Sequence, residues 1–481
     1  MNGPIVRVFG VVLVLFALLA FYTARWTIID RSRLQDNPQN KRALLAQEKI
    51  ARGSIVAGDG ATLARSVRAA DGTYTRRYPQ QSLFSHAVGY AYLIPGTAGL
   101  EQFYNGTLTG RSRGLENTLR KLQGKGGQGN DLRTSLDPRA QQVALQQLAG
   151  RPGAVVALDP RTGRVRVMAS IPNYDPNALR TEKATAALNR APGAPLLNRN
   201  TQGLYPPGST MKVVTSIAAI DTGRYTPDSI VNGKNGIRIS GVPLNNDGGT
   251  DWGPIDLTTA LTHSVNTVFA QVGENLGKAT MQRYMDRLGF EKPVQVDLPL
   301  GERYPSGTYC DRAGSLRLVQ PTSGCVDIGR VAIGQSKLLV TPLQMAMVAA
   351  AVANGGDLMT PYIATRAVDP DGRTVLQNQP TVFSHVMSRA TADKLTAMMQ
   401  KVVQEGTGTA AALQNFNVAG KTGTAEKGTP GSNITQPWFI AFAPADNPRV
   451  AIAVTIEKTI GGFGGTDAAP IAKAVMESLL Q

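Results

Sequence analysis

The chain has 481 residues, of which 42% are hydrophobic and 17% are charged, and this globular balance excludes intrinsic disorder for most of its length. The formal net charge is +16 and the pI is about 9.9, which suits an anionic partner such as a lipid surface, a nucleic acid or an acidic wall polymer. Three histidines and two cysteines are too few for a zinc cluster built from these residues.

The first predicted element is an uncharged, apolar run at residues 8–24, bounded by Arg7 and Arg25. It reaches the length of a membrane span, and no small-residue cleavage site follows it. We therefore interpret residues 1–26 as a cytoplasmic tail with an uncleaved signal anchor, rather than as a helix buried in the fold. The arginines that follow the run favour a cytoplasmic bulk by the positive-inside rule, but long domains cross the membrane regardless of such charges.

Residues 27–150 form the second predicted domain. It opens on a turn-rich stretch near residues 52–60, and the glycine-rich basic stretch at 110–131 indicates a flexible segment or a hairpin rather than a core. This domain contains no cluster of residues with catalytic chemistry. We interpret it as a non-catalytic pedestal.

Residues 151–481 form the third predicted domain, which begins with a β-hairpin made by residues 154–158 and 165–169. Residues 211–220 are apolar on nearly every side and predict a buried helix. Asp256 is typical of a residue that caps a helix, which we expect to run on towards Asn275. Further helices are expected at residues 337–353 and 390–404, and surface insertions at 224–255 and 302–330.

The C-terminal part predicts strands at residues 418–425, 438–443 and 450–457, followed by a helix over 471–480 that Pro470 begins. Strands at both ends of this domain, with helices between them, predict an α+β fold in which one antiparallel sheet packs against an all-helical subdomain.

The two cysteines, Cys310 and Cys325, are spaced for one closed loop. Outside the cytoplasm we expect them to form a disulfide bond, while the alternative is a pair of free buried thiols.

One motif combines a hydroxyl nucleophile with a base. Ser209 follows two prolines and Gly208 at the expected start of the buried helix, and Lys212 comes one helical turn later on the same face. A serine hydroxyl needs a neighbouring base to take its proton, and a lysine serves as that base when burial lowers its pKa. The first-turn backbone N–H groups are positioned to stabilise an oxyanion.

Two further motifs extend this chemistry. Ser264 and Asn266 offer a second hydroxyl for proton relay and an amide for a peptide-like substrate. Lys421, Thr422, Gly423 and Thr424 lie on a predicted strand, where Gly423 gives the clearance that a substrate added along the strand edge requires.

The ordered set S-x-x-K, S-x-N and K-T-G resembles that of the penicillin-recognising serine acyltransferases, although Val265 stands where the family set has Asp. The rest of the chain resembles class B penicillin-binding proteins, most of all their compact actinobacterial members. This wider resemblance rests on residues 52–55, 59–60, 99–101, 205–209, 333–335, 340–346, 438–439 and 442–444. It implies the penicillin-binding transpeptidase fold preceded by an elongated pedestal or dimerisation-type domain.

The resemblance also implies roles. Ser209 attacks the penultimate D-Ala carbonyl of a stem pentapeptide, Lys212 is its general base, and Ser264 with Lys421 passes the proton to the leaving amine. Asn266 binds the donor peptide amide, and the backbone N–H groups of Ser209 and Thr424 form the oxyanion hole. Thr422, Gly423 and Thr424 complete the substrate-binding strand, with both threonines as candidates for the substrate carboxylate. No metal or organic cofactor is implied.

Other members of this fold remain alternatives. A β-lactamase needs a base that holds a deacylating water, and we find no convincing Glu-x-x-x-Asn loop between Ser264 and Lys421. A D,D-carboxypeptidase uses water as acceptor, and the amino-terminal boxes argue against it. A penicillin-binding sensor or scaffold would have several membrane spans or a lost motif residue.

The resemblance predicts the partners and the location as well. We expect peptidoglycan stem peptides ending in D-Ala-D-Ala, β-lactam antibiotics and the cytoplasmic membrane as ligands, and no nucleic acid. A polytopic lipid-II polymerase with other division or elongation proteins is the expected protein partner. The chain is expected to be a single-pass protein of the cell membrane with its catalytic domain outside the cytoplasm.

Overall fold

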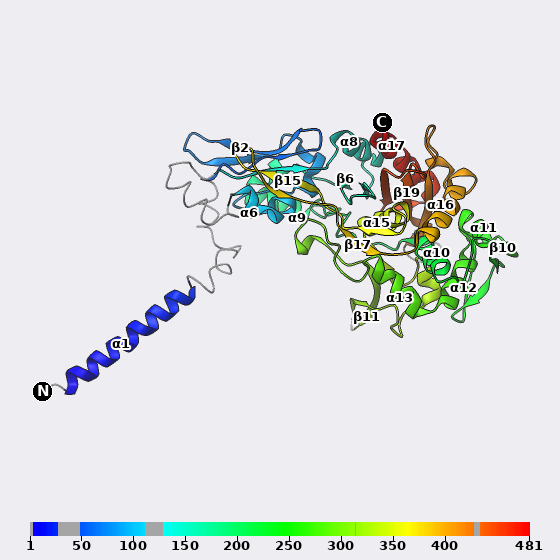
Figure 1. Cartoon of the computed structure of the whole chain (residues 1–481), viewed down its shortest axis with the longest axis horizontal. Coiled ribbons are helices and arrows are strands. Elements are labelled where there is room, and N and C mark those ends of the chain that lie inside the picture. The colour runs from blue at the N-terminus through cyan, green and yellow to red at the C-terminus, as the bar shows by residue number, and fades with distance from the viewer. Residues whose placement is uncertain (1–2, 27–48, 111–127, 313, 428–432) are drawn as a thin grey trace.

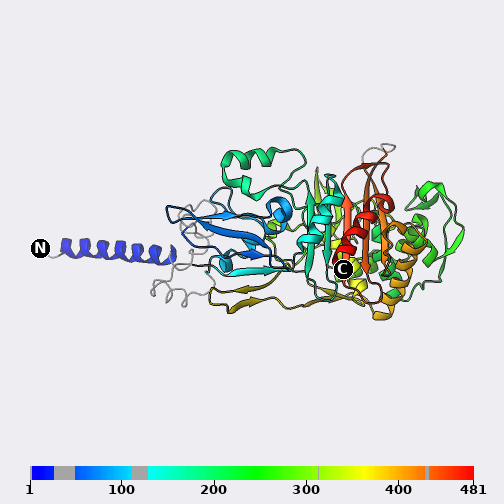
Figure 2. The ribbon, with the colours of Figure 1, turned by 90° about the horizontal axis from the view of Figure 1, so that it is seen from above.

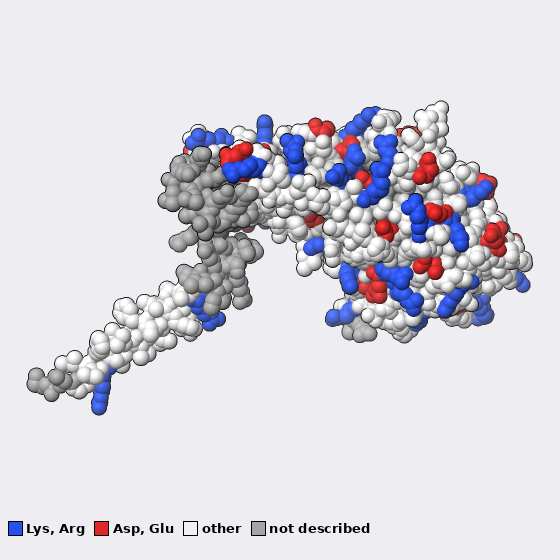
Figure 3. Space-filling view, in the orientation of Figure 1, with Lys and Arg blue, Asp and Glu red and all other residues white. Residues whose placement is uncertain are grey.

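The computed structural model describes residues 3–26, 49–110, 128–312, 314–427 and 433–481 (Figure 1). The predicted glycine-rich stretch therefore lies mostly outside the described residues. The apolar run forms helix α1 (Gly3–Ala24), which has a mean hydropathy of 2.6 in its most apolar window and buries no residue against the rest of the protein. Among the described residues it is the one helix long and apolar enough to cross a membrane. On the face that Figure 3 shows, the coloured side chains of this segment are blue and lie near its two ends.

A six-stranded sheet organises the N-terminal part of the folded chain, in the order β16-β15-β4-β1-β2-β3. Two of its strands, β15 and β16, come from far along the sequence, and Figure 2 shows this hairpin running back along the blue N-terminal strands. All neighbours are antiparallel except β1 and β4, which are parallel. The strands are β1 (Ile55–Val56), β2 (Thr62–Arg68), β3 (Tyr74–Arg77), β4 (Asp131–Thr134), β15 (Ala364–Val368) and β16 (Thr374–Gln377).

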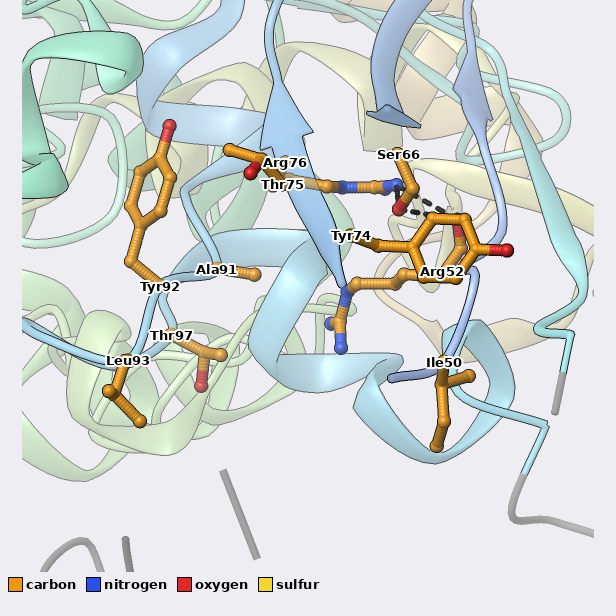
Figure 4. A pocket seen from close by; sticks show the side chains of 10 residues that line it. All are labelled: Ile50, Arg52, Ser66, Tyr74, Thr75, Arg76, Ala91, Tyr92, Leu93 and Thr97. Carbon is orange, nitrogen blue, oxygen red and sulfur yellow. Dashed lines mark hydrogen bonds between the residues drawn. The ribbon is translucent and has the colours of Figure 1, made fainter. Parts of the chain in front are cut away.

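A buried ion cluster ties this sheet to the short helix α5 (Gly99–Phe103). The carboxylate of Glu101, which has no exposed surface, accepts from the Nε atoms of Arg52 and Arg76, each at 2.5 Å. Arg76 also donates to the Arg52 carbonyl at 3.1 Å and to Ser66 at 3.3 Å (Figure 4). Burial opposes ionisation of Glu101, but Arg76 and Arg52 outweigh it and hold its pKa below the ordinary value.

A second, antiparallel sheet has the order β18-β19-β20-β5-β6, so strands from both ends of the predicted third domain pair as the sequence indicates. Both faces are covered, and β5 alternates between them: Val155 and Ala157 pack towards α8 and α17, while Val156 and Leu158 face the opposite core. Covered faces explain why these strands are continuously apolar. The elements are β5 (Gly153–Leu158), β6 (Val165–Ile171), β18 (Ala419–Lys427), β19 (Ile434–Ala443), β20 (Val450–Ile456), α8 (Pro138–Leu148) and α17 (Ala469–Leu480).

Helices fill the other side of this sheet around α10 (Met211–Asp221), of which every residue but the last is buried. The helix α15 (Pro342–Ala353) packs directly on the sheet, and α10 lies among the remaining helices. These are α11 (Leu257–Thr262), α12 (Asn266–Leu276), α13 (Lys278–Arg287), α14 (Ile328–Ala332) and α16 (Arg389–Gln404).

Small hairpins are inserted between the helices of this part. The expected insertion at 224–255 contains β7 (Ile230–Asn232), β8 (Ile237–Ile239), β9 (Val242–Leu244) and β10 (Pro254–Asp256), and the one at 302–330 contains β11 (Gly307–Arg312) and β12 (Ser315–Val319). A disulfide joins Cys310 of β11 to Cys325, with the Cα atoms 6.4 Å apart. Two short strands, β13 (Leu338–Leu339) and β14 (Asp357–Met359), pair with β11 and with β17 (Val382–His385), respectively.

The remaining short elements connect these layers. They are η2 (Gln81–Phe84), α4 (Ser85–Val88), α6 (Asn105–Leu108), η3 (Pro176–Arg180), α9 (Glu182–Arg190), η4 (Gly208–Thr210), η5 (Asp247–Gly249), η6 (Leu300–Glu302), η7 (Thr409–Ala411), β21 (Thr459–Ile460) and η8 (Gly464–Ala468).

Two predicted helices differ from the structure. The helix expected from Asp256 to Asn275 is broken between α11 and α12, because Ser264 takes a left-handed backbone conformation with φ of 60°. The helix expected from residue 337 begins only at Pro342, where Thr341 caps it, since the preceding residues pair as β13.

The domain division expected at residue 150 stays a prediction, and contacts cross it in both directions. Helix α8, before that boundary, shares an apolar cluster with α17 and the second sheet. Conversely, β15 and β16 lie after the boundary but belong to the first sheet. The physical reason is that sheet edges and apolar helix faces are covered by whichever segment reaches them, not by the nearest in sequence.

We expect Glu101→Gln to lower the free energy of unfolding by about 3–5 kcal/mol at pH 7, because it leaves two buried guanidinium groups without their counter-charge. The lowered pKa of Glu101 means that its ionised form stabilises the fold above the unfolded pKa. This stability is lost as the pH falls through the folded value, so the difference between variant and wild type shrinks in acid. Urea unfolding of the purified full chain at several pH values measures it.

The matched control is Glu405→Gln, which removes an exposed ion pair with Lys401 at 3.3 Å. Exposed pairs contribute less than about 1 kcal/mol. Equal destabilisation by the two substitutions would contradict a structural role for the Glu101 cluster.

Candidate active site

A groove of about 1040 Å³ lies between the second sheet and the helical part, and it is the place where the three motifs meet. Its walls include Ser209, Ser264, Asn266 and residues 422–424. The cavity beside Arg52 and Arg76 in the first sheet measures only about 100 Å³, which is too small for a peptide (Figure 4). The groove is therefore the candidate active site.

Ser209 lies in η4, immediately before α10, and is partly exposed at the groove wall. The chain before it is fixed by side chains of the sheet: Trp438 donates its ring N–H to the Pro206 carbonyl at 3.0 Å, and Tyr205 packs edge-on against the Trp438 ring. The Tyr205 hydroxyl also donates to Glu457 at 2.5 Å. The turn that presents Ser209 is thus anchored to β19 and to the residue that follows β20.

Two glycines allow this turn to touch β18. Gly208 has φ of +54°, and a Cβ there would lie 2.7 Å from the Thr424 carbonyl oxygen. A Cβ on Gly423 would lie 2.8 Å from the Pro207 carbonyl oxygen. From the sequence, we expect the space beside Gly423 to admit a substrate. In the structure, the turn that contains Pro207 lies in that space. That contact sets the distance between Ser209 and the strand.

Lys212 has no exposed surface, and its Nζ donates to three oxygens: the Ser264 carbonyl at 2.6 Å, the Ser264 hydroxyl at 3.2 Å and Asn266 Oδ1 at 2.7 Å. Among the described residues, none of its hydrogen bonds goes to Ser209. Burial, followed by repulsion from Lys421, places the pKa of Lys212 well below its ordinary value, and Asp247 partly opposes this. Lys212 therefore loses its proton far more readily than a lysine in water does.

Ser264 owes its position to the break between α11 and α12. Its left-handed backbone turns the hydroxyl and the carbonyl of the same residue towards Lys212. A non-glycine residue in this conformation costs on the order of 1–3 kcal/mol and is typically retained at functional sites. The neighbouring Val265 is only 1% exposed and belongs to the main apolar cluster, so the middle position of this motif serves packing here.

Asn266 begins α12, and both ends of its amide have partners. Its Oδ1 accepts from Lys212, and its Nδ2 donates to the Asn245 carbonyl at 3.1 Å. The next residue, Asn246, is buried and binds the backbone N–H and the hydroxyl of Thr267, each at 3.0 Å. The 224–255 insertion is therefore clamped to α12 and supports the Asn266 side chain, a contribution that sequence reasoning missed.

Lys421 also has no exposed surface, and burial lowers its pKa to about 7. Its Nζ donates to the Thr422 carbonyl at 3.0 Å and to the Thr422 hydroxyl at 3.3 Å. Thr422 shares a 2.6 Å hydrogen bond with Thr407, and Thr424 accepts from the Gly464 backbone N–H at 3.2 Å. The K-T-G strand thus joins a cationic group to two hydroxyls at the groove wall.

The structure brings the predicted site residues together around one groove. It lacks one contact of the expected proton relay, the one between the described residues Lys421 and Ser264. Among the described residues, no hydrogen bond joins Lys421 to Ser264; Lys212 is the lysine that contacts Ser264. Several residues that line the groove are missing from the sequence-based prediction. For those at positions 463–466, the glycine-rich turn at 461–465 was a signal that could have been used. The residues missing from the prediction include Asp247, His263, Thr407, Thr409, Glu426, Asn433, Phe463, Gly464, Gly465 and Thr466.

The described residues contain no group of three or more His, Cys, Asp or Glu side chains that could hold a metal ion. What the groove offers is an accessible hydroxyl, a buried amine with a lowered pKa, a second hydroxyl beside that amine and an edge strand. This set is suited to nucleophilic acyl transfer with a lysine base.

Comparison with known proteins gives two family matches. The "Penicillin binding protein transpeptidase domain" matches residues 153–477, and the "Penicillin binding protein A dimerisation domain" matches residues 52–132. The peptidoglycan D,D-transpeptidases PbpA of Mycolicibacterium smegmatis and Mycobacterium tuberculosis are 33% and 34% identical. Each alignment covers 100% of this chain and 99% of the relative.

Solved structures of penicillin-binding protein A from M. tuberculosis are similar as well. Its ceftriaxone acyl-enzyme complex has a TM-score of 0.82 at 31% identity and covers 91% of this chain and 100% of that chain. Its penicillin G acyl-enzyme complex has a TM-score of 0.80 at 32% identity and covers 90% and 100%.

The two lysines predict a bell-shaped pH dependence for the rate at which penicillin G acylates the protein. The rate rises as Lys212 loses its proton, because only the neutral amine accepts the serine proton. It falls as the pH passes about 7, because Lys421 then loses the charge that attracts the ligand carboxylate. Stopped-flow acylation at constant ionic strength measures both limbs. A rate that keeps rising from pH 7 to 9 would show that Lys421 acts in its neutral form.

Proposed function

The chain belongs to the penicillin-binding protein transpeptidases, and we propose that Ser209 is the nucleophile of this member, with Lys212 as its general base. The chain is a peptidoglycan D,D-transpeptidase that works through a serine acyl-enzyme and is acylated by β-lactams. The observation that supports this assignment of residues is the buried, triply hydrogen-bonded Lys212 one turn after a groove-exposed serine.

In the first half-reaction, the Ser209 oxygen forms an ester with the penultimate D-Ala carbonyl, while Lys212 takes the hydroxyl proton. The backbone N–H groups of Ser209 and Thr424 stabilise the oxyanion, since Gly208 and Gly423 bring their segments together. The C–N bond then breaks, and the proton passes from Lys212 through the Ser264 hydroxyl to the departing D-Ala amine.

In the second half-reaction, the amine of another stem peptide attacks the ester. Its proton returns through Ser264 and Lys212 to Ser209, which leaves an amide cross-link and the free enzyme. Asn266 binds the donor peptide amide, and Thr422 with Lys421 binds the terminal carboxylate. These roles rest on the positions of the side chains around the groove.

The anchor helix α1 supports a single-pass location, with the catalytic domain outside the cytoplasm where stem peptides are cross-linked. The disulfide between Cys310 and Cys325 is compatible with an oxidising compartment. Protease protection in spheroplasts tests this orientation, because only an external catalytic domain is cleaved from outside.

We also propose that the first sheet contacts a polytopic lipid-II polymerase, because a transpeptidase cross-links glycan strands that a polymerase supplies, and the matched dimerisation domain lies mostly on this sheet. Deletion of residues 27–150 would be a poor test, because it removes α8 and unpairs β15. Photo-crosslinking from position 67, which is exposed on β2, leaves the fold intact. We expect adducts with the polymerase, and their absence from several exposed positions of β2 would contradict this contact.

Incubation of the full chain with penicillin G should give one covalent adduct per chain by intact-mass spectrometry, and Ser209→Ala should abolish it. Lys212→Ala should slow its formation by about a hundredfold or more, because general bases contribute on the order of 10²–10⁴ in rate. Asp393→Asn, an exposed change outside the groove, serves as the matched control. An undiminished adduct in Ser209→Ala would overturn the assignment.

A further inference from the structure

The groove is acidic although the protein as a whole is basic. The formal net charge is +16, and lysine and arginine are spread over the face shown in Figure 3. Among the described residues that line the groove, however, the side chains with a formal charge are Asp247 and Glu426, both negative. The two lysines of the site lie buried beneath the wall. These two carboxylates would attract a positively charged group on a substrate.

Glu426 belongs to β18, the strand along which the peptide substrate is expected to bind. Side chains alternate along a strand, so Thr422, Thr424 and Glu426 share one face of β18, and all three line the groove. β18 is an edge strand of the sheet, so it is free to pair with an added peptide strand. Glu426 follows Thr424 by two residues, which is roughly 7 Å along the strand.

The groove runs along only one part of β18, and this fixes the direction in which a bound peptide extends. Its lining on this strand begins at Thr422 and continues through Thr424 to Glu426, and residues 419–421 do not line it. Towards Glu426 it stays open, with Asn433, Thr435 and Phe463 continuing the wall. A donor whose terminal carboxylate lies by Lys421 and Thr422 therefore extends past Thr424 towards Glu426.

The side chain of Glu426 is exposed and has no ion pair or hydrogen bond among the described residues. The strand is thus polar along its length, with a cationic group at 421 and an uncompensated carboxylate at 426. Asp247 differs, because it lies across the groove on η5 and its charge acts on Lys212. Glu426 is the carboxylate on the path of the donor.

We propose that Glu426 is a specificity-determining residue that binds a side-chain ammonium on the residue preceding D-Ala-D-Ala in the donor peptide. This inference rests on the proposed function, and it adds the residue of this chain that recognises the side-chain amine of the donor. The chemistry of the reaction agrees with it: donors and acceptors are stems of the same polymer, so each donor also carries the amine that acts as acceptor elsewhere.

The test uses two tripeptide donors, Nα-acetyl-Lys-D-Ala-D-Ala with the side-chain nitrogen either dimethylated or acetylated. The dimethylated amine is cationic but cannot form an amide, so the comparison isolates donor binding from the acceptor role. Both reactions contain the same acceptor amine at one fixed concentration, so that the acyl-enzyme turns over. We expect the full chain to release D-Ala from the cationic donor with a kcat/KM about threefold to fivefold higher than from the acetylated donor, the size of an exposed ion pair. This preference should shrink between about 0.05 M and about 1 M salt.

Glu426→Gln should bring the ratio of the two kcat/KM values close to one, and Glu426→Lys should invert it. The matched control Asp393→Asn should keep the wild-type ratio, because Asp393 is exposed but outside the groove. An unchanged ratio in both Glu426 variants, or equal rates for the two donors in the wild type, would overturn the inference. A wild-type chain that forms no penicillin G adduct would instead overturn the proposed function.

Discussion

The burial of two lysine side chains that repel each other is the constraint on which the rest of this site depends. Lys212 and Lys421 have no exposed surface, and a buried charge is tolerated only when its donors are satisfied or its proton is lost. The protein meets both conditions: oxygens of Ser264 and Asn266 surround Lys212, and burial lowers the pKa of each lysine. Packing alone therefore makes Lys212 a base that loses its proton more readily than a lysine in water does.

The second sheet makes this burial possible. Its two faces are covered by different apolar clusters, while the outer edge of β18 has no strand beside it among the described residues. The glycines of η4 and β18 then bring the serine turn against that edge to within contact distance. Nucleophile, base and substrate strand are thus positioned by three separate elements, and each depends on the same close approach.

The groove and the first sheet show two uses of buried charge. In the first sheet, Glu101 neutralises two arginines and the cluster is closed to substrate. In the groove, the charges are positive below and negative at the open end of the strand. The ion cluster of the first sheet fixes how its segments pack. The charges of the groove instead differ between its two ends, so that a charged peptide binds in one orientation. The hairpin of β15 and β16 links the two parts, because a segment between α15 and α16 completes the first sheet.

Much of this could be predicted from the residues alone. The apolar anchor, the buried helix after Ser209, the strand runs near the C-terminus and the three motifs are local patterns, and local patterns survive folding when burial agrees with them. The tertiary structure decided what depends on distant contacts. Only packing breaks the helix at Ser264, clamps α12 to the insertion through Asn246, and buries Lys421. Likewise, the pairing of β15 with β4 and the approach of Pro207 to Gly423 join residues far apart in the chain, and no local pattern encodes such contacts.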